Sequence, residues 1–325
     1  MPNRLSALPR ELACATSGQR LQTRTLNDWP LPATLLCGAA SGPNLLLTAG
    51  VHGCEYCSIQ ACLELVRELD PRELAGNVLI VPVANMSGFY DRLPALVAED
   101  GKNLNRVFPG SADGSFSEQL ALLITSLQDW ADFYVDLHGG DLHEAMHPFV
   151  FVPGVAEPEV TECARAAARC LDVDVRVLSG ATTGAYNSAA LRGTPSLLIE
   201  RGGLGRWSRA EVDAYKKDLY ALLRHLTILP GTPASQSPGT DSAGPADRQR
   251  ECTRPVYLEA ECRGFWYPAC GIEPGAPVHK GQTLGVVRDL SGAPLQEYRA
   301  EQDGMVLYMT VSLAVKEATP LVAYG

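Results

Sequence analysis

Short apolar runs alternate with amphipathic stretches along residues 45–228 of the chain. Five of these runs are too short for helices and end at glycine, proline or polar turns, which is typical of buried strands. They are LLLTA (45–49), VLIVPVA (78–84), FYVDL (133–137), FVFV (149–152) and SLLI (196–199). The pattern therefore predicts a series of strands separated by other elements.

The stretches between the strands carry helical patterns. In residues 56–69 the apolar side chains recur at the spacing that puts them on one face of a helix. Two more helices, over 116–130 and 209–228, each follow a serine with a glutamate three residues later, which is the pattern of a capping box. Alternating strands and helices predict an α/β fold, in which a mixed, largely parallel sheet is flanked by helices.

The composition changes twice after this region. Residues 230–250 show no apolar periodicity and are rich in Pro, Gly, Ser, Thr and Ala, which predicts a linker or a flexible loop. Residues 251–325 consist of short β-like runs punctuated by glycines. We therefore expect an α/β domain over 1–229 and a small β-barrel-like domain over 251–325, which packs on the first and could border its cleft.

Charge and composition narrow the choice of partners. The 325-residue chain has a formal net charge of −10 at pH 7, whereas nucleic acids and anionic membranes attract basic surfaces, so a small molecule is the expected partner. Neither a signal-like apolar region nor a run long enough to span a bilayer is present, which predicts a cytoplasmic location. The ten cysteines have no framework spacing, so we expect reduced thiols.

Polar residues follow four of the predicted strands, at the edge where open α/β sheets bind ligands. His52 and Glu55 come after the first strand, the loop DGKNLNR (100–106) after the second, His138 after the third and Glu200 after the last. Two histidines and one glutamate match the ligand set of a catalytic zinc, and a second glutamate could accept the proton of a bound water. An arginine in the loop suits a substrate carboxylate, because it can form two parallel hydrogen bonds.

Four motifs, HGCE, DGKNLNRVFPG, DLHGG and LLIERGG, occur in this order at separations that resemble the succinylglutamate desuccinylase/aspartoacylase family, a branch of the zinc carboxypeptidase fold. The resemblance covers about 45–228 by motif and extends to the C-terminal β-domain by layout. It implies one zinc ion per subunit, held by His52, Glu55 and His138. It also implies that Glu200 is the general base and proton shuttle.

The resemblance implies substrate-binding residues as well. Asn105 and Arg106 would bind a carboxylate of the amino-acid product. In aspartoacylase-like members a tyrosine and then an arginine precede the general base and line the substrate pocket. Tyr186 fits the spacing of that tyrosine, whereas Arg192 is near the position of the arginine but displaced from it.

One position departs from the family pattern. Many members have an arginine about eight residues before the Asn-Arg pair, where it polarises the scissile carbonyl, and this chain has Ala98 there. We expect that Arg92 or Lys102 takes this role, or that zinc polarises the carbonyl alone. The acyl group therefore need not be succinyl or acetyl.

The segment HEAMH (143–147) matches the H-E-x-x-H motif of zincin metalloproteases. That motif requires a helix, because only there do the two histidines share one face. The preceding GGD and the following Pro148 leave little room for a helix. We therefore expect a loop, from which His143 or Glu144 could face the substrate.

Cys54 and Cys57 form a C-x-x-C pair interleaved with the H-x-x-E pair. They open a helix after a strand, which is also where thioredoxin-like enzymes place their redox motif. A redox centre would leave His138, Glu200 and the Asn-Arg loop without a role. We therefore expect both cysteines to be small buried residues at a helix start.

Taken as one site, these residues predict a zinc-dependent deacylase, which cleaves the amide bond of an N-acyl amino acid or a related small carboxylate. A metallocarboxypeptidase acting on short peptides is an alternative, since the same arginine can grip a C-terminal carboxylate. A thiol oxidoreductase built on the C-x-x-C pair and a non-catalytic binding protein are the others. The chain could form a homo-oligomer.

Overall fold

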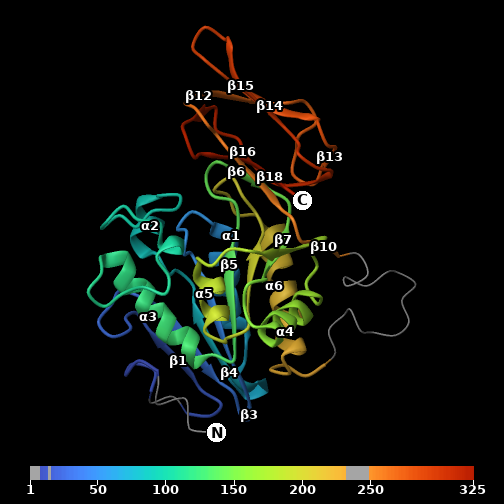
Figure 1. Ribbon diagram of the computed structural model, residues 1–325. Helices are drawn as coiled ribbons and strands as arrows, with labels where there is room; N and C mark the ends of the chain where they lie inside the picture. The colour runs from blue at the N-terminus through green and yellow to red at the C-terminus, as the bar shows by residue number, and fades with distance from the viewer. Residues whose placement is uncertain (1–7, 14–15, 232–248) are drawn as a thin grey trace.

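The computed structural model of the protein describes residues 8–13, 16–231 and 249–325. It has a large α/β part and a smaller C-terminal β part, which stands on one end of the first (Figure 1). Except for two residues at each end, the predicted linker over 230–250 lies outside the described residues.

The α/β part is built on one sheet with the strand order β1-β2-β4-β3-β5-β9-β7-β8-β10. The strands are β1 (Arg20–Thr23), β2 (Ala33–Cys37), β3 (Ala40–Ala49), β4 (Ala75–Val81), β5 (Phe133–His138), β7 (Phe149–Pro153), β8 (Val175–Ser179), β9 (Ser196–Glu200) and β10 (Arg250–Cys252). Five of the neighbouring pairs are parallel and three are antiparallel. This confirms the prediction of a mixed, largely parallel sheet.

The five predicted strands are confirmed as β3, β4, β5, β7 and β9. Four strands were not predicted. β1 and β10 are short edge strands with exposed positions, and β8 has polar residues at two of its five positions, so none of the three forms an apolar run. The fourth, β2, is an apolar run that was missed.

Helices cover both faces of the sheet (Figure 1). They are α1 (Tyr56–Glu68), α2 (Met86–Asp91), α3 (Phe116–Trp130), α4 (Pro158–Ala168), α5 (Ala185–Leu191) and α6 (Arg209–His225), with 3-10 turns η2 (Pro71–Glu73) and η3 (Leu104–Arg106). α1, α4 and α6 pack on one face, and α3 and α5 pack on the other. The predicted helices are confirmed as α1, α3 and α6. Among the described residues, no helix is long and apolar enough to cross a membrane.

The capping residues inferred from the sequence form hydrogen bonds at the helix starts. The backbone N–H of Ser115 donates to Glu118 Oε2 over 2.9 Å before α3. Ser208 Oγ accepts from the backbone N–H of Glu211 over 3.2 Å before α6. Each bond satisfies a polar group that a helix start would otherwise leave unpaired.

The central strand β5 is buried along its whole length, because helices cover the sheet on both sides. Phe133, Val135 and Leu137 point into the core under α1, α4 and α6. The intervening residues, among them Asp136 and His138, point to the face of α3 and α5. The alternation therefore decides on which side of the sheet a site at the end of β5 lies.

The C-terminal part contains β11 (Val256–Glu259), β12 (Gly264–Pro268), β13 (Pro277–Val278), β14 (Thr283–Arg288), β15 (Pro294–Arg299), β16 (Gly304–Thr310), β17 (Ala314–Val315) and β18 (Pro320–Tyr324). They form two antiparallel sheets, β11-β18-β16-β13 and β15-β14-β12-β17, around a core of their own. The expected boundary at residue 251 falls inside β10, which pairs with β8 of the large sheet.

The HEAMH segment is neither a zincin helix nor the loop that we expected. Glu144–Met146 form the short strand β6, which pairs antiparallel with β16 of the C-terminal part. His143 is exposed, whereas His147 Nε2 lies 3.1 Å from Asp174 Oδ2. The two histidines therefore do not share a metal site, and the segment joins the two parts of the molecule instead.

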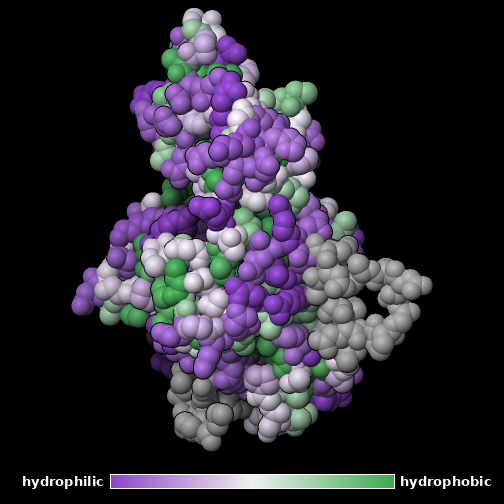
Figure 2. Space-filling view, turned by 45° about the vertical axis from the view of Figure 1, so that its right-hand side comes forward, coloured by the Kyte–Doolittle hydropathy of each residue, from purple (hydrophilic) through white to green (hydrophobic). Residues whose placement is uncertain are grey.

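The junction between the two parts is also packed with apolar side chains. Phe149 and Cys252 of the large sheet share a buried cluster with Leu307 and Ala323 of the C-terminal part. On the face shown in Figure 2 the molecule narrows at this junction, and hydrophilic residues border much of the narrowing.

Candidate metal centre

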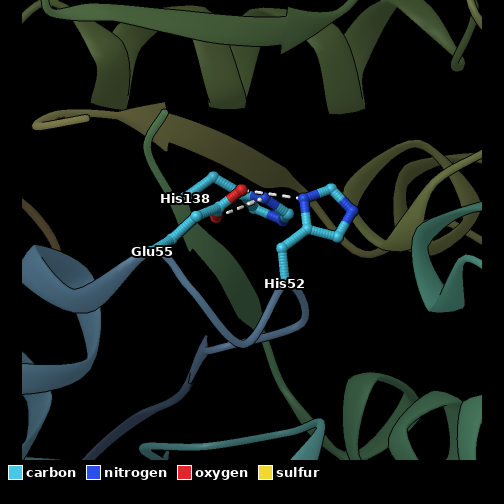
Figure 3. A group of neighbouring side chains, drawn as sticks. All are labelled: His52, Glu55 and His138. Atoms are coloured by element: carbon cyan, nitrogen blue, oxygen red, sulfur yellow. Dashed lines mark hydrogen bonds and ion pairs between the residues drawn. The ribbon is translucent and has the colours of Figure 1, made fainter. Parts of the chain in front are cut away.

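His52, Glu55 and His138 converge at the carboxyl ends of β3 and β5 (Figure 3). His52 Nδ1 lies 2.8 Å from Glu55 Oε1, and His138 Nδ1 lies 3.0 Å from Glu55 Oε2. One ligand atom from each residue can be chosen so that all lie within 4.8 Å of one another. In the described part of the chain this is the one group of its kind. The predicted ligand set is thus brought together.

The turn that carries His52 and Glu55 follows from two glycines. Gly50 begins it with a φ of +64°, a left-handed conformation that favours glycine. A Cβ at Gly53 would lie 2.2 Å from the backbone nitrogen of Phe89, so a larger residue would collide with the backbone of α2. The turn is therefore held tightly against a neighbouring helix before α1 begins.

The outer nitrogen of His52 forms a hydrogen bond, whereas that of His138 has a charge contact that lacks hydrogen-bond geometry. His52 Nε2 lies 3.2 Å from Asn103 Oδ1, and His138 Nε2 lies 3.0 Å from Asp136 Oδ2. Asp136 is itself held by a 2.9 Å hydrogen bond from Thr48 Oγ1. Such outer partners fix the orientation of a metal-ligating histidine and direct its inner nitrogen to the metal.

The charges at this group favour a cation between the ligands. Burial lowers the pKa of His138, but the charges of Asp136 and Glu55 outweigh burial and hold that pKa well above its usual range. Burial raises the pKa of Glu55, but the two histidines outweigh it and lower that pKa. Carboxylates therefore surround a position at which positive charge is strongly stabilised, and a divalent metal ion fits that requirement.

Glu200 ends β9 directly beside His138 of β5 in the parallel register. Its Oε2 is buried and has no hydrogen-bond partner among the described residues. Burial raises the pKa of Glu200, His138 lowers it, and the charges of Glu55 and Glu144 raise it further, so that it lies well above its usual range. A raised pKa favours a carboxyl group that takes up a proton, as a general base must.

The predicted carboxylate-binding pair lies on η3. Asn105 Oδ1 accepts a 2.8 Å hydrogen bond from the backbone N–H of Ala185, which leaves the amide nitrogen of Asn105 for a ligand. Arg106 donates to the backbone oxygen of Asn105 over 3.3 Å and forms no ion pair with any described residue. The guanidinium of Arg106 therefore does not order the loop through a salt bridge.

Asp100 orders this loop instead. Its Oδ1 accepts from Ser117 Oγ over 2.6 Å and from the backbone N–H of Lys102 over 3.1 Å. Its Oδ2 accepts from the backbone N–H of Ser117, over 2.8 Å, in the first turn of α3. Partial burial raises the pKa of Asp100, but the hydrogen bonds from Ser117 outweigh it and lower the pKa to about 2.

The lowered pKa predicts an acid-sensitive contribution to stability. The stabilisation from Asp100 is fully present above pH ~4 and is lost as the pH falls toward 2. We expect Asp100→Asn to lower the free energy of unfolding by about 1 kcal/mol at pH 7 and by progressively less below pH ~4. Urea unfolding of both proteins between pH 7 and 3.5 measures this difference.

The exposed Asp113, to which no hydrogen bond is assigned among the described residues, offers a matched control. Asp113→Asn should change the free energy of unfolding by less than ~0.5 kcal/mol at every pH. If Asp100→Asn and wild type differed equally at pH 7 and 3.5, the carboxylate of Asp100 would not hold the loop.

Tyr186 and Arg192, the two predicted pocket residues of α5, have different surroundings. Tyr186 is buried and stacks on Phe151 with 6.1 Å between ring centroids. Burial raises the pKa of Tyr186, hydrogen bonds with Ser179 and Asn187 lower it, and the charge of Glu200 raises it further. Arg192 is tied to α3, with its Nε 2.9 Å from Asp129 Oδ1. That it lines the substrate pocket stays a prediction.

Arg92 and Lys102 are the candidates for polarising the scissile carbonyl, the role that the family arginine has at the position of the exposed Ala98. Their surroundings also differ. Lys102 Nζ lies 2.8 Å from Glu118 Oε2, so its charge is engaged at the start of α3. Arg92 is exposed and forms no ion pair with a described residue. Burial raises the pKa of the Cys54 thiol, and the charge of Arg92 partly offsets this. Arg92 is the better placed of the two.

The C-x-x-C pair is buried, as expected. Cys54 and Cys57 are almost completely shielded from solvent, and burial raises the pKa of both thiols. The Cys57 thiol donates a hydrogen bond to the backbone oxygen of Arg206 over 3.4 Å. Redox and nucleophilic chemistry require the thiolate, which this environment disfavours.

Two tyrosines from the C-terminal part were not predicted. Tyr257 on β11 and Tyr308 on β16 both lie opposite Ala323 of β18, so they stand on the same face of one sheet. Burial raises the pKa of both hydroxyls, and the charge of Glu200 contributes to each rise. The C-terminal part thus puts two tyrosines on one face of its sheet, which no local pattern around either tyrosine indicates.

Comparisons with known proteins find a family model and a relative that are both described as deacylases. The family model described as succinylglutamate desuccinylase/aspartoacylase catalytic domain matches residues 41–226. An N-alpha-acetyl-L-2,4-diaminobutyric acid deacetylase from Halomonas elongata is 29% identical over 291 residues, which cover 85% of this chain and 80% of that protein.

Solved structures agree with this match. A succinylglutamate desuccinylase/aspartoacylase from Rhodobacter sphaeroides superposes with a TM-score of 0.80 at 27% identity and covers 95% of this chain and 96% of its own. The product-bound ectoine utilization protein EutE (DoeB) from Ruegeria pomeroyi superposes with a TM-score of 0.78 at 28% identity and covers 94% and 93%.

Proposed function

The chain belongs to the succinylglutamate desuccinylase/aspartoacylase family, and from this premise we propose that it is a zinc-dependent deacylase of small N-acyl amino acids. The observation that carries the proposal is the group of His52, Glu55 and His138 beside the unpartnered carboxyl of Glu200. This combination offers a metal site and a proton acceptor at one end of one sheet. Amide hydrolysis requires both.

His52, Glu55 and His138 would hold one zinc ion per subunit. Zinc, when bound, polarises the scissile carbonyl and lowers the pKa of water, which is the chemistry that a neutral amide needs. Two imidazoles and one carboxylate support this identity, although the same set also accepts cobalt or manganese. Asn103 and Asp136 would keep the two imidazoles in position.

Glu200 would accept the proton of the attacking water and then give it to the leaving amine. Its raised pKa supports the first step, because a more basic carboxylate takes up a proton more readily. Its position beside His138 in the sheet supports this role. The neighbouring Tyr186 would help to orient the amide.

Arg106 and the amide nitrogen of Asn105 would bind the carboxylate of the amino-acid half. The free guanidinium supports this role, since an arginine without an ion pair can form two hydrogen bonds to a substrate carboxylate. Holding that carboxylate fixes the distance from the amide to the metal site. Arg92 would be the cation available to the scissile carbonyl in place of the residue missing at Ala98.

The role of Arg106 can be tested in a pair of variants. Arg106→Ala should lower kcat/KM for an N-acyl amino acid by roughly 10- to 100-fold, mainly through KM, because a charge-assisted hydrogen-bond pair is lost. Lys102→Ala in the same loop should change KM less than about threefold, since Lys102 pairs with Glu118. Equal effects of the two variants would remove Arg106 from the substrate site.

The activity itself is tested by offering the zinc-loaded protein a panel of N-acyl amino acids and dipeptides. The family relative from Halomonas elongata is named for an N-acetylated amino acid, so acetyl, succinyl and longer acyl groups belong in the panel. We expect release of free amino acid from N-acyl substrates. Cleavage of dipeptides alone would favour a carboxypeptidase instead.

A two-domain division, a cytoplasmic location and a homo-oligomeric state stay predictions.

A further inference from the structure

The hydrogen-bond ladder between β5 and β9 weakens at the end of the sheet that carries the metal group. Near the start of the two strands the backbone N–H of Tyr134 donates to the backbone oxygen of Pro195 over 2.9 Å. At the other end the backbone N–H of Arg201 donates to the backbone oxygen of His138 over 3.4 Å, which is beyond the usual length of such a bond. The ladder therefore holds His138 and Glu200 less firmly than the start of their strands.

Tyr215 of α6 ties the two strands together at this end. Its hydroxyl donates to the backbone oxygens of His138 and Ile199, the latter over 2.8 Å, and shares its one proton between them. Ile199 directly precedes Glu200 in the chain. Tyr215 is completely buried, so removal of its hydroxyl would leave two backbone oxygens without this donor in a place shielded from water.

About one turn farther along α6, Asp218 holds the residue on the other side of Glu200. Asp218 Oδ2 lies 2.7 Å from Arg201 Nε, and both side chains are buried. Asp218 Oδ1 accepts a 2.7 Å hydrogen bond from the backbone N–H of Asp172, so the ion pair is also fixed to a neighbouring loop. A buried ion pair with further hydrogen bonds is costly to break. One helix thus holds both chain neighbours of Glu200.

These contacts come from the opposite face of the sheet. Ile199 and Tyr215 belong to the core under α1, α4 and α6. His138 and Glu200 lie directly opposite each other in the pairing of β5 with β9, and both point to the other face, on which Leu198 is buried under α3 and α5. The hydroxyl of Tyr215 bonds to backbone atoms, so it bears on the side chains of His138 and Glu200 through the backbone alone.

We propose that Tyr215, supported by the ion pair of Arg201 with Asp218, is a positioning residue that fixes Glu200 relative to the metal group. This inference rests on the proposed deacylase function and adds to it a residue on the far face of the sheet. Proton transfer depends steeply on the distance between the groups that exchange the proton, and a misplacement of about 1 Å can lower a rate by roughly 100-fold. A tie between the backbones of β5 and β9 therefore bears directly on the rate.

Tyr215→Phe removes the hydroxyl and keeps the ring. At a temperature at which circular dichroism shows a folded protein, we expect kcat of the zinc-loaded variant on an N-acyl amino acid to fall by roughly 10- to 100-fold. KM should change less than about threefold, because Arg106 is untouched. The Kd for zinc should also stay within about threefold, since the side chain of His138 keeps its contacts with Glu55 and Asp136.

Tyr220→Phe is the matched control. It makes the same change on the same helix, at a hydroxyl that lies 3.3 Å from Glu68 Oε2 and away from both strands. Its kcat, KM and Kd for zinc should stay within about twofold of the wild-type values, because no backbone atom of β5 or β9 loses a donor.

A double-mutant cycle separates positioning from general damage. If Tyr215 acts through Glu200, adding Tyr215→Phe to Glu200→Gln should lower the remaining kcat by less than about threefold. A loss of active protein would instead lower kcat by one factor in both backgrounds. Arg201→Lys extends the cycle, since lysine keeps the charge beside Asp218 but loses the second arm, which donates to the backbone oxygen of Asp172. It should follow the same pattern with a loss of roughly threefold to tenfold.

The outcomes separate the two proposals. No hydrolysis of any N-acyl amino acid by zinc-loaded wild type would overturn the deacylase function. If wild type is active, the positioning role is wrong when Tyr215→Phe keeps the wild-type kcat or loses the same factor with and without Glu200→Gln. A Kd for zinc that rises more than about threefold would also overturn it, because the hydroxyl would then hold the metal ligand and not the base. If Tyr215→Phe does not fold, Arg201→Lys decides by the same criteria.

Discussion

Glu200→Gln is expected to lower kcat by roughly 10²- to 10⁴-fold while the protein still binds its metal. Glutamine preserves the size and one oxygen of the side chain, but it cannot accept the proton of the attacking water. KM should change little, because Arg106 and the metal group are untouched. Steady-state kinetics on an N-acyl amino acid, together with the zinc content of the purified variant, measures both effects.

The same variant has an expected effect on stability. The pKa of Glu200 is raised by burial and by the charges of Glu55 and Glu144, so its charged form is unfavourable in the folded protein. Glu200→Gln should therefore melt at the same temperature as wild type or higher. The exposed Glu273 provides the control, since Glu273→Gln should leave both kcat and melting temperature unchanged. If Glu200→Gln kept its metal and hydrolysed the substrate at the full wild-type rate, the proposed mechanism would be wrong.

Loss of the metal is expected to abolish hydrolysis. A chelator should reduce the activity to background, and added zinc should restore it, because the protein would then regain both the carbonyl polarisation and the acidified water. His138→Ala should not regain activity, since it removes one of the three ligands. Thermal unfolding gives a second readout: zinc at 100 times its Kd should stabilise wild type by about 2.7 kcal/mol.

The control for this experiment comes from the other histidine motif. His147→Ala alters HEAMH, whose His147 pairs with Asp174, and it should leave the zinc content and the zinc-dependent stabilisation unchanged. Zinc should also bind more tightly as the pH rises, because metal displaces the proton that the neighbouring carboxylates stabilise on His138. Equal zinc stabilisation of His138→Ala and wild type would place the metal elsewhere.

Much of the fold follows from the order of residues along the chain. The apolar runs that became β3, β5 and β9 are buried by helices on both faces, so burial leaves a local signature that can be read directly. Edge strands such as β1 and β10 leave none, because part of each is exposed. The strand β6 is set by its partner β16 and not by its own three residues.

The pattern of residues by itself determined where His52, His138 and Glu200 would meet, because the carboxyl ends of parallel neighbouring strands share one edge of a sheet. Tertiary structure alone decided which of the remaining polar groups are free. Arg106 forms no ion pair with a described residue while Arg192 is tied to Asp129, and Glu144 lies in a strand whose partner is more than 150 residues away. Burial repeats along the sequence with the period of a helix or a strand, so it can be predicted from the sequence. Whether a charged side chain forms an ion pair depends on which distant segment packs against it.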